Sequence, residues 1–252
     1  MGICKLCLKE KQLIKSHIIP EFLYQELFDE NHKIFSFNPL EIGTEMARIK
    51  RPSSGEWESN LLCSECDTNV IGSYETYASI AMYGGLLHQN ESPIVENFVN
   101  QEGIHFTNCK NIDYKKFKIF LLSILWRASI SSRQIFSRIS LGVHEEQIRQ
   151  MLLTGNPGDT MDYPIFLMTY KNDNTMPNDF IGQPPGEIKS NGLTVFIFMI
   201  AGMVYCFYMN SKEIQFPVWL LEQTIKPINE MNIIHLPKGK ALEVFKGLHG
   251  LK

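Results

Sequence analysis

CKLC at residues 4–7 and CSEC at residues 63–66 are two cysteine pairs of equal spacing, and they decide the fold of the first third of this chain. Two-residue spacing lets both thiolates of a pair point at one ion, and two pairs complete a tetrahedral zinc site. Two disulfides, or four buried or redox-active cysteines, are the alternatives, and a reducing compartment disfavours the disulfides. The predicted ligands of a structural Zn²⁺ are Cys4, Cys7, Cys63 and Cys66.

The other two cysteines, Cys109 and Cys206, stand alone in apolar or irregular surroundings. Isolated cysteines of this kind usually pack as small hydrophobic residues. A thiol redox protein would place one pair in a βαβ context, and neither pair has one. Cys109 and Cys206 are therefore predicted to lie outside the metal site.

His17 lies between the two pairs, in the segment SHIIP at residues 16–20. A histidine flanked by apolar residues can pack in a core with its hydrogen bonds satisfied. An imidazole with a pKa of about 6.5 can equally accept a proton at neutral pH, as a general base must. The residues alone leave both interpretations open.

The segments CKLC, SHIIP and NLLCSECD, the last of which opens a helix, together resemble the zinc-bearing branch of the HNH endonucleases. That family has a treble-clef, ββα-metal fold, and the similarity covers about the first 80 residues. It implies a metal-dependent nuclease that hydrolyses phosphodiester bonds, with DNA favoured over RNA as the substrate. It also implies that His17 is the general base, and that a second ion, Mg²⁺ or Mn²⁺, binds apart from the zinc.

The resemblance is weakest at that second ion, because Ser16 occupies the position before the histidine where the family carries an acid or a histidine. Asp67 follows the last cysteine and offers the hard oxygen that Mg²⁺ prefers, although a charge that stabilises the helix start is an equal interpretation. Glu75, two turns further on, is a third candidate, or else a solvated residue or the partner of a basic side chain. Asn60 stands closer to Cys63 than the family's usual asparagine.

A second functional class stays open, in which a zinc-stapled module has lost catalysis and binds nucleic acid or a protein partner. Ser16 is its best support. By analogy alone, the nuclease would suit a phage-defence or mobile-element setting.

The expected fold class is α+β, with a treble-clef module over residues 1–90 and a helical, then antiparallel-sheet, region over 91–252. A strand is predicted over 14–19 and helices from residues 20, 66 and 113, the last with a buried stripe at Phe117, Phe120, Leu121, Ile124, Leu125 and Ala128. A loop is expected over 48–60. Later elements are a helix over 144–153, a strand within 163–170, a strand pair over 194–209 and a helix over 217–225.

The uncharged run at 193–210 approaches the length of a membrane span, but its β-branched and aromatic residues favour two strands joined at Ala201-Gly202. The N-terminus lacks the apolar region of a secretory signal, so a cytoplasmic location is expected. A net charge of −3 gives no overall attraction to nucleic acid. Phosphate contacts would need a local patch, for which the candidates are Lys9, Lys11, Lys15, Arg48, Lys50, Arg51, Arg127, Arg133 and Arg138.

Overall fold

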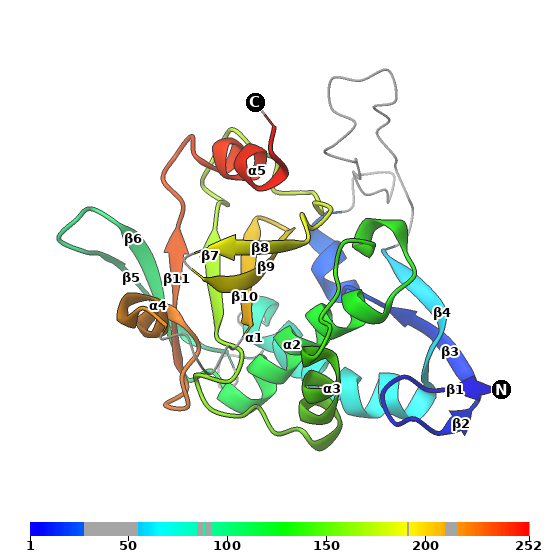
Figure 1. The fold of residues 1–252 in the computed structure, drawn as a ribbon. Helices are drawn as coiled ribbons and strands as arrows, with labels where there is room; N and C mark the ends of the chain where they lie inside the picture. The colour runs from blue at the N-terminus through cyan, green and yellow to red at the C-terminus, as the bar shows by residue number, and fades with distance from the viewer. Residues whose placement is uncertain (28–54, 85–87, 89–91, 191, 210–215, 252) are drawn as a thin grey trace.

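The structure is a computed structural model that describes residues 1–27, 55–84, 88, 92–190, 192–209 and 216–251. Within these residues the chain is of mixed helix and strand, as the α+β prediction requires. Two short antiparallel hairpins and a helix form the N-terminal part, and a seven-stranded sheet with flanking helices forms the rest (Figure 1).

The first cysteine pair lies in the loop between β1 (Gly2–Ile3) and β2 (Glu10–Lys11), which pair antiparallel. The backbone N–H of Cys4 donates to the carbonyl of Lys9 at 3.0 Å, and that of Leu8 donates back to the carbonyl of Cys4 at 2.8 Å. These bonds fold the loop tightly enough to bring both cysteines to one side.

The predicted strand before His17 is confirmed as β3 (Leu13–His17), which pairs antiparallel with β4 (Trp57–Cys63). The expected loop over 48–60 is therefore wrong from Trp57 onward, and its residues 48–54 lie outside the described ones. The register shifts between Ile14 and Lys15, so that β4 carries a bulge. This hairpin carries His17 at one end and Cys63 at the other.

A continuous helical segment follows the second cysteine pair, as predicted. Its first part, Glu65–Ile71 (η3), is a π-helix, and it runs directly into α1 (Gly72–Tyr83). The segment after Pro20 is also helical, but Glu21–Leu27 (η1) forms a 3₁₀-helix. Together β3, β4 and α1 give the N-terminal part a strand–strand–helix order.

The long helix α2 (Tyr114–Ile130) begins where the sequence predicts, because Asp113 caps it and accepts from the N–H of Lys116 at 2.9 Å. The predicted stripe is buried, and so is every other residue from Phe117 to Ala128. It packs against α1 on one side and against α3 (His144–Thr154) on the other. A left-handed Gly155 ends α3, as expected.

The seven-stranded sheet runs in the order β5-β6-β11-β7-β10-β9-β8. Its strands are β5 (Ile94–Val99), β6 (His105–Lys110), β7 (Ile165–Thr169), β8 (Glu187–Ser190), β9 (Leu193–Ile200), β10 (Met203–Met209) and β11 (Glu230–His235). All neighbours pair antiparallel except β7 and β11, which are parallel, so the antiparallel prediction holds for all but one pair.

The uncharged run near residue 200 forms β9 and β10, and Ala201 and Gly202 make the turn with positive φ angles of 51° and 75°. The predicted strand pair is therefore confirmed. None of the helices in the described part of the chain combines the length and apolar character that a membrane crossing requires.

Alternate side chains of the sheet bury on opposite faces. One face joins a core with α1, α2 and the N-terminal hairpins, and the other packs under α4 (Val218–Gln223) and α5 (Ala241–His249). The first core is continuous from Leu6, beside the first cysteine pair, through Phe120 to Met231. The described residues on both sides of the expected boundary at residue 90 therefore share one apolar core.

Candidate functional site

The four paired cysteines come together. One ligand atom from each of Cys4, Cys7, Cys63 and Cys66 lies within 4.8 Å of every other. Zn–S bonds of about 2.3 Å in a tetrahedron place the sulfurs about 3.8 Å apart, so the cluster fits a zinc ion after a small contraction. The predicted set of metal-binding residues is thus assembled, from a loop, the end of a strand and the start of a helix.

Backbone hydrogen bonds prepare one thiol of the cluster for ionisation. Burial alone would raise the pKa of Cys4, but backbone N–H groups, including that of Cys63 at 3.4 Å from its sulfur, lower that pKa to about 7. Burial and the neighbouring thiols raise the pKa of Cys66. Four thiolates this close would repel one another, because too few positive groups lie near them. They can therefore all ionise only when a dication binds them.

Cys109 and Cys206 lie apart from this cluster. Both are buried, in β6 and β10, and burial raises their pKa values to about 11 and about 12 respectively. Neither thiol therefore has the thiolate character of a reactive or ligating cysteine.

His17 is the last residue of β3, opposite Trp57 in β4, and it is half-buried. Burial lowers the pKa of His17, the charges of Lys15 and Arg127 lower it further, and those of Glu21 and Glu75 oppose them. The imidazole is therefore neutral at pH 7 and able to accept a proton.

Asp67 lies in the first turn of η3, next to Cys66. Burial raises its pKa, while the Ser16 hydroxyl and the charges of Arg127 and His17 act to lower it. The side chain of Ser16 is fully buried, and its hydroxyl faces this carboxyl without the geometry of a full hydrogen bond. The buried Ser16 hydroxyl and the partly buried Asp67 carboxyl thus lie close to each other, and the charge of His17 acts on Asp67.

Glu75 lies on α1, and its carboxylate Oε1 is 2.7 Å from Nη2 of Arg127. Its charge acts on both His17 and Asp67. The side chain of Arg127 is only 1% exposed, whereas that of Glu75 is 24% exposed. Glu75 is thus the partner of a buried basic side chain, one of the two alternatives that the sequence left open.

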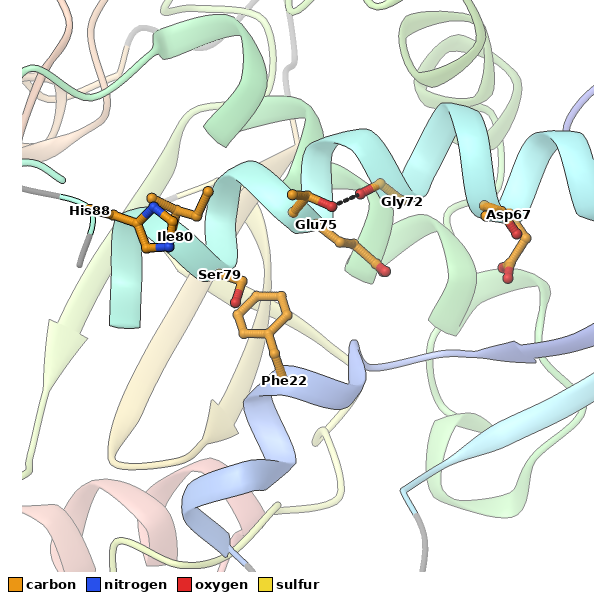
Figure 2. Close-up of a pocket in the computed structure, with 9 residues that line it drawn as sticks. Phe22, Asp67, Gly72, Glu75, Ser79, Ile80 and His88 are labelled. Carbon is orange, nitrogen blue, oxygen red and sulfur yellow. Dashed lines mark hydrogen bonds between the residues drawn. The ribbon is translucent and has the colours of Figure 1, made fainter. Parts of the chain in front are cut away.

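A pocket of about 690 Å³ runs along one face of α1 from Asp67, past Gly72 and Glu75, to Ser79, Ile80 and His88. Figure 2 shows Asp67 at one end of this row and His88 at the other, with the ring of Phe22 facing the helix across the space. Thr68 and Thr76 add hydroxyls to the wall. The pocket is large enough for a nucleotide-sized group, with two carboxylates along its wall.

Asn60, the fourth residue predicted for this site, does not line the pocket. It lies in the bulge of β4 with a φ of 72°, and its side chain is exposed. Asparagine tolerates this left-handed backbone better than most residues, which gives it a structural reason to be there. The structure places Asp67 and Glu75 on the wall of the pocket, whereas neither His17 nor Asn60 lines it; the charges of His17 and Glu75 still act on Asp67.

Arg127 contacts residues of this site, although the sequence analysis predicted it to be part of a basic surface patch. As one of the basic residues after the apolar stripe of α2, it is a candidate for a surface patch, but its burial rules that out. The signal was present, because an arginine inside a helix that is otherwise apolar needs a buried acid or carbonyl group. Arg48, Lys50 and Arg51 lie outside the described residues.

Comparison of the chain with protein-family models, with curated proteins and with solved structures found no match.

Proposed function

We propose that this protein is a metal-dependent nuclease of the HNH type that hydrolyses phosphodiester bonds, with DNA as the favoured substrate. One observation carries the proposal: Arg127 holds both the His17 carbonyl and the Glu75 carboxylate at 2.7 Å, and the charges of His17 and Glu75 act on Asp67, which directly follows the four-cysteine cluster. The order of the hairpin β3–β4 and the helix after the second cysteine pair agrees with a treble-clef, ββα-metal unit.

His17 acts as the general base. Its imidazole is neutral at pH 7 for the reasons given above, and its side chain is only half-buried, so water can reach it. A neutral imidazole removes a proton from water as the water attacks the phosphorus atom. The proton then rests on the His17 ring, where the charges of Glu21 and Glu75 favour it.

Asp67 and Ser16 would hold the catalytic ion. The Asp67 carboxylate is a hard oxygen donor of the kind that Mg²⁺ and Mn²⁺ prefer, and the buried Ser16 hydroxyl, which lacks a full hydrogen bond, is a second and weaker oxygen beside it. When bound, the ion supplies neutralising charge for the phosphate and the leaving oxygen. Zinc held by four cysteines has no open coordination position, so its part here is structural.

The alternative is a zinc-stapled module that binds nucleic acid or a protein partner without catalysis. Two observations favour it: a serine stands where an acid is expected, and one oxygen of Glu75 is committed to Arg127. Both proposals share the zinc site and differ in whether His17 performs chemistry.

Cleavage of plasmid DNA and of a structured RNA by the purified full chain, with Mg²⁺ or Mn²⁺, separates the two. We expect cutting that EDTA abolishes and that His17→Ala lowers by about 100-fold or more, the range of a general base. His105→Ala is the matched control, because His105 is exposed on β6 and belongs to no part of this site. Zinc content must be equal in all three proteins.

If neither substrate is cut with either ion, or if His17→Ala cuts as well as the wild type, the catalytic assignment is wrong. The binding module is then the better account, and DNA affinity measured at two salt concentrations would test it.

A further inference from the structure

Arg127 carries a buried guanidinium whose three nitrogens each contact an acceptor. From α2, its Nε donates to the carbonyl of Ser123 at 3.2 Å and its Nη2 to the Ser123 hydroxyl at 3.3 Å. Its Nη1 donates to the main-chain oxygen of His17 at 2.7 Å, and its Nη2 also pairs with Glu75. One side chain therefore joins the core helix to β3 and to α1.

From this geometry we infer that Arg127 is a positioning residue for the site: it fixes the main chain of His17 and the carboxylate of Glu75 relative to each other. This inference rests on the proposed function. The His17 carbonyl lies at the end of β3, where the N–H of the same peptide unit, that of Ile18, donates to the carbonyl of Glu56 at 2.9 Å, so Arg127 holds the other side of this peptide. A rigid, planar guanidinium bonded to this carbonyl and to the Glu75 carboxylate sets the direction in which the imidazole leaves the strand.

The second half of the chain thus contributes to the site without touching a substrate. Arg127 is 1% exposed and cannot reach a phosphate in solvent, so its effect passes through the residues it holds. A base must stay within hydrogen-bond reach of the attacking water, and a displacement of about 1 Å can lower a rate about 100-fold. Catalysis therefore depends on α2 as well as on the N-terminal ββα unit.

Arg149 on α3 provides a matched control. It too is buried, it donates from Nη1 to the carbonyl of Leu6 between Cys4 and Cys7, and it pairs with Glu146. It therefore joins another helix of the second half to the N-terminal part in the same way. Among the described residues, its recorded partners do not include His17, Asp67 or Glu75.

The experiment compares Arg127→Lys and Arg127→Met with Arg149→Lys and Arg149→Met in the full chain. Zinc content and denaturant unfolding establish that each variant is folded and loaded, and the lysine variants serve if a methionine variant fails to fold. The readouts are kcat and KM for cleavage and the ring resonances of His17 at one fixed pH, assigned by their loss in His17→Gln.

We expect Arg127→Lys to lower kcat at least 10-fold with KM within about 3-fold, since the substrate is not contacted, and to shift the His17 ring resonances. Arg149→Lys should leave both within about 2-fold of the wild type and leave those resonances in place. Equal losses of kcat in the two variants, or unmoved His17 resonances in Arg127→Lys, would overturn the inference. If the wild type cuts nothing, the proposed function fails, and the resonances alone then decide whether Arg127 places His17.

Discussion

The Nη2 atom of Arg127 lies 2.7 Å from Oε1 of Glu75, and this ion pair joins the core helix α2 to the helix that follows the cysteine cluster. The arginine is almost wholly buried and the glutamate only partly exposed, so the pair is shielded from solvent on one side. Removing one member of a buried pair leaves the other charge without compensation, which costs much more than loss of a surface pair.

Glu75→Gln should therefore lower the free energy of unfolding by about 2 to 3 kcal/mol, somewhat below the range for a fully buried pair because Glu75 keeps some contact with water. Glu96→Gln is the control, since its pair with Lys110 is 47% exposed on both sides, and we expect a loss of less than about 0.5 kcal/mol there. Denaturant unfolding of both variants measures the difference. Equal losses would mean that the Arg127 charge is compensated by its other acceptors.

The cysteine cluster predicts one tightly held zinc ion per chain. Metal analysis of the purified protein should find it, and replacement by Co²⁺ should give the absorption of a tetrahedral thiolate site. Cys63→Ser should lose the metal and unfold at a lower temperature, whereas Cys109→Ala should keep a full complement because Cys109 is only a packing residue. Retention of the metal by Cys63→Ser would rule out the four-cysteine assignment.

The sequence was sufficient for those parts of the fold that local signals encode. The spacing of the cysteines, the Asp113 cap of α2 and the β-branched and aromatic residues around Ala201-Gly202 each predicted a feature that the structure contains. The strands β4, β5, β6, β8 and β11 were missed, as were the two-residue strands β1 and β2. β5 is exposed at every residue, so no apolar alternation identifies it, and β11 pairs with strands far away in the chain.

The site was predictable as far as single residues reveal their chemistry. His17 and Asp67 were proposed because they lie near the cysteine pairs in the sequence, and in the structure the charges of His17 and Glu75 both act on Asp67. Asn60 was assigned by its distance from Cys63 along the chain, and a bulge in β4 leaves it exposed outside the pocket. The position of Arg127 depends on how α2 crosses the N-terminal hairpin, which only tertiary packing determines.

Asp173 predicts an acid-sensitive step in stability. Its carboxylate accepts from the N–H of Ala241, at the start of α5, at 3.2 Å and from the N–H and hydroxyl of Thr175. Burial opposes ionisation, but these hydrogen bonds outweigh it and lower the pKa of Asp173 to about 2. Because the folded pKa lies below the unfolded value of about 3.9, the contribution is complete above pH 5 and is lost as the pH falls from about 4 toward 2.

Asp173→Asn should thus lower the free energy of unfolding by about 1 kcal/mol at pH 7, the size of a helix-cap contribution. The difference in the free energy of unfolding between wild type and variant should become smaller below pH 4. Unfolding by denaturant at pH 7, 4 and 3 tests this, with Asp179→Asn as the control on the same loop. A gap that stays constant with pH would show that the hydrogen bonds, and not the charge, carry the effect.

Lys118 predicts a second pH-dependent contribution at alkaline pH, with the same sign: stability rises with pH. It is buried in α2, with Nζ 3.0 Å from the hydroxyl of Tyr114 and 2.5 Å from the carbonyl of Asp159. Burial lowers the pKa of Lys118 to about 8, although the charges of Asp162 and Asp159 oppose it. The folded state therefore releases this proton more easily than the unfolded state does.

With the folded pKa below the unfolded value of about 10.4, wild type gains stability relative to Lys118→Met as the pH rises from 8 toward 10.4. Between pH 8 and 9.5 the gain should be about 1 to 2 kcal/mol, since each pKa unit corresponds to about 1.4 kcal/mol. Comparison with the methionine variant at each pH cancels the titration of all groups that the two proteins share. Denaturant unfolding of both proteins at pH 7, 8 and 9.5 measures this gain. A difference in the free energy of unfolding that does not change with pH would show that the Lys118 ammonium stays charged because Tyr114 and Asp159 compensate its burial fully.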